Sequence, residues 1–227
     1  EPVLWFLLFI GLTALVVLLG VDKGIEKVSK IMMPVLIALI LFVAIYTLCT
    51  VDGAVDGLIY YVKPNFSAFG PETVLAAMGQ LFYSMSLAMG IMITYGSYMK
   101  KEISIEKSVK QIEVFDTGIA VLAGLMIVPA VYIFQGLDGM GQGAGLMFET
   151  LPKVFETMPG GAIIGAIFFI MVFFAALTSS ISLMETIVST CMEMFKASRK
   201  KVSLIIAILF YYTIVEHYFP RVYDNYT

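Results

Sequence analysis

Long apolar runs alternate with short polar segments along this chain. Six runs come close to or exceed the roughly 20 residues that a helix needs to cross the hydrocarbon core of a bilayer. They cover residues 3–19, 31–48, 73–98, 113–135, 161–192 and 202–218. The pattern therefore predicts an all-α protein, a polytopic membrane helix bundle.

The third run, QLFYSMSLAMGIMITYGSY, has small residues at every second position in its middle: Ser84, Ser86, Ala88 and Gly90. A period of two suits extended backbone, and a glycine inside a helix costs roughly 0.5–1 kcal/mol. A helix broken at mid-membrane exposes backbone groups, which is tolerated only beside protein or a ligand-holding cavity. A continuous helix whose small residues let a neighbour pack closely is the alternative.

The polar connections between the runs differ in charge. One set of alternate connections holds eleven of the fourteen basic residues, namely Lys23, Lys27, Lys30, Lys100, Lys101, Lys107, Lys110, Lys196, Arg199, Lys200 and Lys201. The opposite set holds only Lys63, Lys153 and Arg221. Because basic residues concentrate on the cytoplasmic side, we expect a multi-pass protein of the plasma (inner) membrane with residue 1 outside.

Three of the connections carry further local signals. Residues 51–73 contain acids, glycines and prolines and are predicted to form a loop. Residues 136–159 are predicted to form a glycine hinge followed by a short helical hairpin broken at Pro152. In the first connection, Gly24 and Pro34 could let the segment unwind, or Pro34 could simply kink the helix.

Composition supports a membrane location. The chain is 60% hydrophobic and only 14% charged, against about 25% charged in soluble proteins. With a net charge of -3 and no basic tract interleaved with aromatic residues, nucleic acid is not an expected partner. The chain starts at Glu1 without a basic region or a cleavage site, so we expect no signal peptide, and we expect an internal piece of a longer chain.

Polar residues within the apolar runs are the candidates for chemistry. Asp116 would be a hard oxygen ligand for a cation, or an acid at a helix start near the interface. Thr178 and Ser179 follow two alanines and could form half of an oxygen cage for Na⁺, or could bond back to carbonyls of their own helix. Glu185 could be a buried proton or cation partner. We find no constellation of catalytic side chains, so we do not expect an enzyme.

These motifs, together with FDTGIAVLAGLMIVPAVY and FETLPKVF, resemble the neurotransmitter:sodium symporter family and in particular its bacterial branch. The likeness covers nearly the whole chain, and the six runs look like spans four to nine of about a dozen. It implies an inverted-repeat transporter fold with a broken central helix, of which residues 1–227 form a partial domain. The family's first and third spans, which also contribute to its sites, have no counterpart in this sequence.

The resemblance implies a set of substrate-binding residues. Tyr83 takes the place of an aromatic lid, and Ser84 and Ser86 take the place of the backbone and hydroxyls that receive the substrate amino group. Met89 stands at a pocket position that is commonly aromatic, and Leu183 matches an apolar pocket wall.

The resemblance also implies two sodium sites, each completed by residues absent from this chain. Ser84 and Asp116 belong to the first site, and the Ala175 carbonyl, Thr178 and Ser179 to the second. Asp116 replaces an asparagine of chloride-dependent relatives. A fixed carboxylate there would supply the charge that chloride otherwise lends, so we expect chloride independence.

Gate residues follow from the same resemblance. Gln80 matches a residue near the extracellular gate, and Tyr98 and Glu193 match members of the cytoplasmic gate. Glu193 is equally consistent with an exposed acid at the membrane interface that has no role in the gate. The function implied is sodium-coupled symport of a neutral, hydrophobic or aromatic amino acid by alternating access, with the amino acid, sodium ions and membrane lipid as partners. A non-transporting receptor or scaffold with the same fold and a channel are the alternatives, and the oligomeric state is left open.

Overall fold

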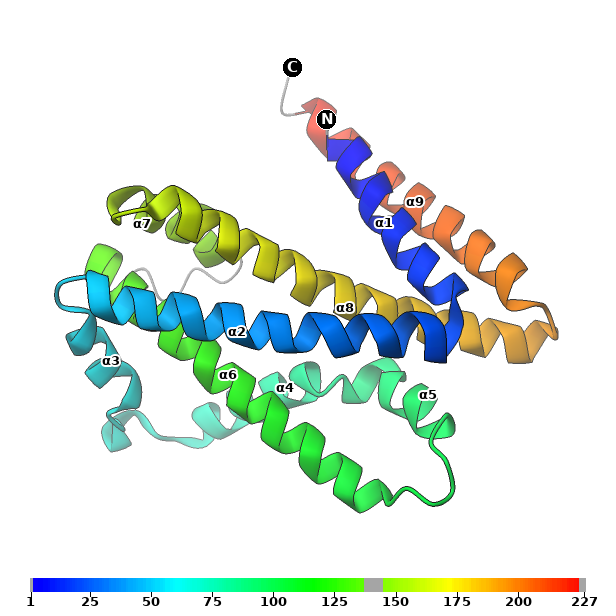
Figure 1. Cartoon of the computed structure of the whole chain (residues 1–227), viewed down its shortest axis with the longest axis horizontal. Coiled ribbons are helices and arrows are strands. Elements are labelled where there is room, and N and C mark those ends of the chain that lie inside the picture. The colour runs from blue at the N-terminus through cyan, green and yellow to red at the C-terminus, as the bar shows by residue number, and fades with distance from the viewer. Residues whose placement is uncertain (1, 137–144, 225–227) are drawn as a thin grey trace. The chain divides into compact units, whose positions relative to one another are not determined.

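The computed structural model describes residues 2–136 and 145–224 (Figure 1). All regular elements of this part are helical, which confirms the predicted all-α fold. The main helices are α1 (Pro2–Leu18), α2 (Glu26–Thr50), α3 (Ala54–Val62), α4 (Pro71–Ser84), α5 (Ile91–Ser97), α6 (Ile105–Gln135), α7 (Leu151–Thr157), α8 (Gly161–Phe195) and α9 (Arg199–Asp224). Residue 1 and most of the predicted glycine hinge lie outside the described residues.

The chain divides into two compact units. Unit 1 comprises Glu1–Met33, Met89–Tyr98 and Phe174–Thr227, and unit 2 comprises Pro34–Ala88 and Met99–Phe173. The division crosses α2 beside Pro34, the segment between α4 and α5, and the middle of α8.

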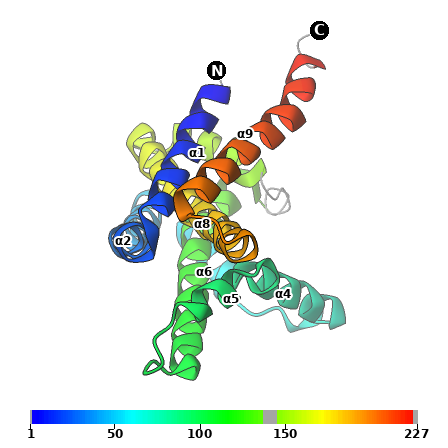
Figure 2. The same ribbon diagram turned by 90° about the vertical axis from the view of Figure 1, so that its right-hand side faces the viewer.

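Unit 1 packs α1, α5, α9 and the C-terminal part of α8 around one apolar core. Val17, Met184 and Val188 are fully buried in it. Helices α1 and α9 contact each other, and Figure 2 shows them diverging toward the first residues of α1 and the last residues of α9. The core therefore ties the last helix of the chain to the first.

Unit 2 contains α3 seated on α6. A Cβ atom on Gly57 would lie 2.6 Å from the Pro129 Cα, so this glycine is needed for the close approach, and the Tyr61 side chain fills the space beside Gly124. The rings of Tyr60 and Tyr132 stack with their centroids 5.2 Å apart.

The prediction of a loop at residues 51–73 was therefore wrong, because α3 lies within it. Gly57 was read as loop punctuation, yet it is a contact residue inside a helix. Gly53, at φ 84°, supplies the left-handed turn just before α3 begins.

Helix α6 extends beyond the apolar run at 113–135 that was predicted as a membrane span. It begins at Ile105, because the Ser104 hydroxyl accepts a hydrogen bond from the Lys107 amide and the Glu106 and Lys110 side chains form an ion pair at 2.8 Å. A reading of apolar runs omits these polar first turns. Pro152 does not break a hairpin but lies in the first turn of α7, where proline is tolerated.

In the described part of the chain, three helical segments are long and apolar enough to cross a membrane, Lys23–Thr50, Ile105–Ile133 and Gly161–Phe195, and Val3–Leu18 is a shorter apolar helix. Pro34 lies inside the continuous helix α2. Gly24 lies in a π-helical turn at Val21–Ile25, where a Cβ atom would lie 2.1 Å from the Val16 carbonyl oxygen.

Candidate functional site

The helical conformation of the third apolar run is interrupted between α4 and α5. Regular hydrogen bonding ends with the Met85 amide, which donates to the Leu81 carbonyl at 3.0 Å. Ser86 has a left-handed conformation with φ 55°, a 3₁₀ turn follows at Leu87–Met89, and Gly90 has φ 74° before α5 begins. A left-handed conformation at a residue other than glycine costs roughly 1–2 kcal/mol. The predicted helix break is confirmed, and a continuous helix is excluded.

At the end of α4, the Ser84 hydroxyl donates a hydrogen bond of 2.5 Å to the Asp116 carboxylate. Asp116 is the twelfth residue of α6, about 16 Å from the helix start at 1.5 Å per residue. It is half-buried. The reading of Asp116 as an acid at a helix start is thereby excluded, and the structure brings together the two residues predicted for the first sodium site.

On α8, the Thr178 hydroxyl lies 3.0 Å from the Ala175 carbonyl oxygen and 3.1 Å from the Phe174 carbonyl oxygen. One hydroxyl proton serves only one of these acceptors at a time. Residues 175, 178 and 179 share one helix face by their spacing, and Ala175 and Ser179 are exposed. The predicted oxygens of the second sodium site therefore lie together, and the expected back-bonding of threonine is also present.

A buried contact between α1 and α8 adjoins this face. The hydroxyl oxygens of Thr13 and Ser180 are 2.7 Å apart, and Thr13 is only 3% exposed. Each hydroxyl also approaches a carbonyl of its own helix. The sequence analysis did not predict this pair. Its only signal in the sequence was Thr13, a polar residue inside the first apolar run.

The predicted substrate residues belong to both units. Tyr83, Ser84 and Ser86 lie in unit 2, and Met89 and Leu183 lie in unit 1. The Tyr83 side chain is 69% exposed and that of Leu183 is 39% exposed, whereas Met89 is half-buried. Gln80 is exposed on α4. Their part in one pocket stays a prediction.

Unit 1 contains a second intramembrane carboxylate, at Glu185, which is fully buried. The Arg199 guanidinium donates to its two oxygens at 2.6 and 3.0 Å, and the Tyr98 hydroxyl donates to one of them at 2.7 Å. We call these three residues the Glu185 cluster. The hydrogen bond to Glu185 raises the pKa of Arg199 above its already high ordinary value, so the guanidinium stays charged.

The structure separates the two residues predicted for the cytoplasmic gate. The structure pairs Tyr98 with Glu185, while Glu193 is exposed near the end of α8. A buried carboxylate needs a cation to offset its lost hydration, and Arg199 provides one for Glu185. One turn before Tyr98, the Tyr95 hydroxyl donates to the Ser182 hydroxyl at 3.0 Å, so α5 is tied to α8 at two points.

A family profile and two relatives that match this chain all belong to sodium-dependent transporters. A profile of the Sodium:neurotransmitter symporter family matches residues 3–219. An uncharacterised sodium-dependent transporter of Bacillus subtilis is 40% identical over 197 residues, which are 87% of this chain and 43% of that protein. An uncharacterised sodium-dependent transporter of Methanocaldococcus jannaschii is 34% identical over 208 residues, which are 88% of this chain and 42% of that protein.

Among solved structures, the chain is similar to the crystal structure of MhsT in complex with L-phenylalanine. The TM-score is 0.81 at 38% sequence identity, and the match covers 93% of this chain and 48% of that chain. The chain thus spans less than half the length of each of these relatives. The similarity is to transporters rather than to enzymes, as the sequence predicted.

Proposed function

Since the chain belongs to the sodium:neurotransmitter symporter family, we propose that it forms part of a sodium-coupled transporter of a neutral amino acid. The observation that carries this proposal is the helix break that ends α4 at Ser84, whose hydroxyl reaches Asp116. The L-phenylalanine bound to MhsT supports a hydrophobic or aromatic amino acid as the substrate.

The interrupted backbone between α4 and α5 would hold the polar part of the substrate. Carbonyl and amide groups that lack helical partners need other partners inside a membrane. A zwitterionic amino acid offers both a donor and an acceptor for them, as broken helices of transporters commonly exploit. Tyr83, Ser86, Met89 and Leu183 would shape the pocket around its side chain.

The first sodium ion would bind at Ser84 and Asp116. In the structure the serine proton satisfies the carboxylate, and sodium would replace that proton as the partner of the carboxylate oxygen. Because the carboxylate brings its own negative charge, the site would not need chloride. We therefore propose chloride-independent transport.

The second sodium ion would bind at the Ala175 carbonyl, Thr178 and Ser179. Thr178 can donate its proton to the Phe174 carbonyl, 3.1 Å away, which leaves the Ala175 carbonyl and the hydroxyl lone pairs free for the ion. Neutral oxygens suit a hard monovalent cation. Each sodium ion that moves down a potential of 100 mV contributes about 2.3 kcal/mol to uptake.

Alternating access would require the inner half of the broken helix to move. Tyr98 ties α5 to Glu185, so we propose that release of this hydrogen bond accompanies opening toward the cytoplasm. Glu193 lies exposed near the end of α8, where a cation could reach it, and Gln80 would act near the outer gate. From the distribution of basic residues we propose that residue 1 lies outside the plasma membrane.

Uptake by the complete protein in proteoliposomes tests the proposal. A radiolabelled hydrophobic or aromatic amino acid should accumulate only when an inward sodium gradient is present, and equally in chloride and in gluconate. Accumulation without a sodium gradient would refute sodium coupling. No uptake of any amino acid would favour the scaffold, and sodium conductance without accumulation would favour the channel.

A further inference from the structure

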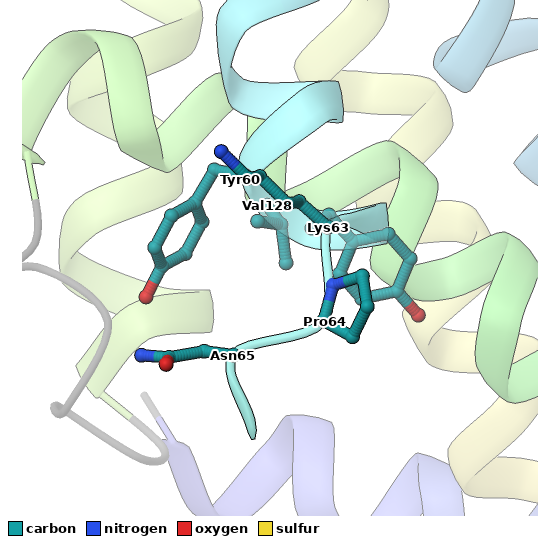
Figure 3. A pocket seen from close by; sticks show the side chains of 6 residues that line it. Tyr60, Lys63, Pro64, Asn65 and Val128 are labelled. Carbon is teal, nitrogen blue, oxygen red and sulfur yellow. The ribbon is translucent and has the colours of Figure 1, made fainter. Parts of the chain in front are cut away.

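Two hollows meet at Lys63 on the surface of unit 2 (Figure 3). The first, which we call the polar hollow, has a volume of about 620 Å³ and is lined by Tyr60, Tyr61, Lys63, Pro64, Asn65 and Val128. The second, the apolar hollow, has a volume of about 520 Å³ and is lined by Leu58, Ile59, Val62, Lys63 and Pro64. Because Lys63 and Pro64 line both, one ligand can occupy the two together.

The wall of the polar hollow is held by close packing of α3 on α6. Gly124 has no side chain, so the Tyr61 ring can lie directly on the α6 backbone. On the other side, the Tyr60 ring stacks on Tyr132. Figure 3 shows the hydroxyl end of Tyr60 and the amide of Asn65 on the same side of the hollow. The contact with α6 thus positions the two tyrosines, whereas Lys63 and Asn65 follow the last residue of α3 and are exposed.

The length of the helices places both hollows at the membrane surface. Helix α2 has 25 residues, which at 1.5 Å per residue is about 37 Å and exceeds the about 30 Å of the hydrocarbon core. Helix α3 begins only a few residues after α2 ends. Tyrosines are enriched at this depth, where one end of the ring is apolar and the other is hydrated.

The lining residues specify an amphipathic anionic ligand. Lys63 supplies the positive charge, and the Asn65 amide and Tyr60 hydroxyl are hydrogen-bond donors. Ile59 is 53% exposed and Val62 is 65% exposed in the apolar hollow. A free amino acid or inorganic phosphate would occupy the polar hollow alone and leave these apolar side chains uncovered.

We propose that the two hollows bind one anionic phospholipid. The Asn65 amide and the Tyr60 hydroxyl bind the phosphate. The Lys63 ammonium, which Figure 3 shows toward the other end of the Tyr60 side chain, attracts the anionic headgroup, and an acyl chain follows Ile59 and Val62. Lysine suits this position because its apolar stem lies along the hydrocarbon while its charge reaches the headgroup. The site serves lipid binding and does not depend on the proposed transport activity.

Native mass spectrometry of the complete protein tests the proposal. The protein is released from micelles that contain equal amounts of dioleoyl phosphatidylglycerol and dioleoyl phosphatidylcholine, and the retained lipids are counted. Lys63→Gln should lower the retention of phosphatidylglycerol about fivefold, the factor that corresponds to about 1 kcal/mol per lysine near an anionic surface. Retention of phosphatidylcholine should not change.

Lys153→Gln is the matched control, because Lys153 is also exposed and also belongs to the sparsely basic set of connections. It should leave the retention of both lipids unchanged. Val62→Ser should weaken the retention of both lipids, since it removes apolar contact and no charge. Asn65→Ala provides a second variant of the polar hollow if Lys63→Gln does not yield folded protein.

Three results would overturn the proposal. The wild-type protein could retain the two lipids equally, or Lys63→Gln and Lys153→Gln could lower retention of phosphatidylglycerol to the same extent. Displacement of the bound lipid by millimolar inorganic phosphate would show that the polar hollow binds free phosphate instead of a lipid.

Discussion

Two carboxylates inside membrane helices have opposite surroundings. Glu185 is fully buried, and Arg199 bonds both of its oxygens. Asp116 is half-buried and accepts a hydrogen bond from Ser84, and among the side chains that the structure describes no lysine or arginine forms an ion pair with it. A fixed cation neutralises Glu185, whereas a mobile cation can neutralise Asp116. The first arrangement suits a structural contact and the second suits an ion site.

Arg199→Gln should produce the largest effect of the substitutions that separate the two carboxylates. Breaking one partner of a buried ion pair costs about 3–5 kcal/mol, and since the Arg199 side chain is 23% exposed we expect about 3 kcal/mol. Thermal unfolding of the purified complete protein measures this loss. Adding Glu185→Gln should restore most of the stability, and a double variant as unstable as Arg199→Gln would contradict the pairing argument.

Asp116→Asn should abolish sodium-driven uptake or make it depend on chloride. Loss of an ionised ligand costs about 1.5–3 kcal/mol, or about 10- to 150-fold in chloride-free uptake. Uptake in gluconate and in chloride measures the effect. Glu113→Gln removes an exposed acid one turn earlier on α6 and should have no effect. Unchanged chloride-free uptake in Asp116→Asn would count against a charged ion site.

Thr178→Val combined with Ser179→Ala should raise the sodium concentration needed for half-maximal uptake about 30-fold, because two neutral ligands worth about 1 kcal/mol each are lost. Sodium titration of uptake measures this. Thr190→Val is the control, since its hydroxyl bonds only to the Thr186 carbonyl of its own helix. An unaltered sodium dependence would remove the second site from this account.

Thr13→Val should have the smallest effect, about threefold in apparent sodium affinity with maximal uptake unchanged, as expected for one neutral hydrogen bond. Thr13 contacts Ser180, which adjoins the second predicted site. Thr13→Ser keeps the hydroxyl and should behave as wild type. If both variants lost affinity equally, packing rather than the hydrogen bond would position α8.

Local patterns predicted the features that depend on neighbouring residues. The small residues at every second position predicted the helix break at Ser86 and Gly90. The presence of an acid within an apolar run indicated that Asp116 could lie inside a helix rather than at its start. The same reasoning gave the all-α fold. The assignment of residues to the two sodium sites depended on the family resemblance.

Features that depend on contacts between distant residues could not be read in the same way. The pairing of Tyr98 with Glu185 depends on which face of α8 meets α5. Helix α3 was missed because Gly57 signals a turn in sequence but serves here as a contact with Pro129. Thr13 and Ser180 are 167 residues apart, so only the fold brings them together.

Binding of radioactive sodium to the purified complete protein tests most directly whether Asp116 is a ligand of a sodium ion. We predict that the wild-type protein binds two sodium ions, that Asp116→Asn binds one, and that Glu113→Gln binds two. If Asp116→Asn bound as many sodium ions as the wild-type protein, with the same affinity, Asp116 would not be a sodium ligand and its contrast with Glu185 would have no functional meaning.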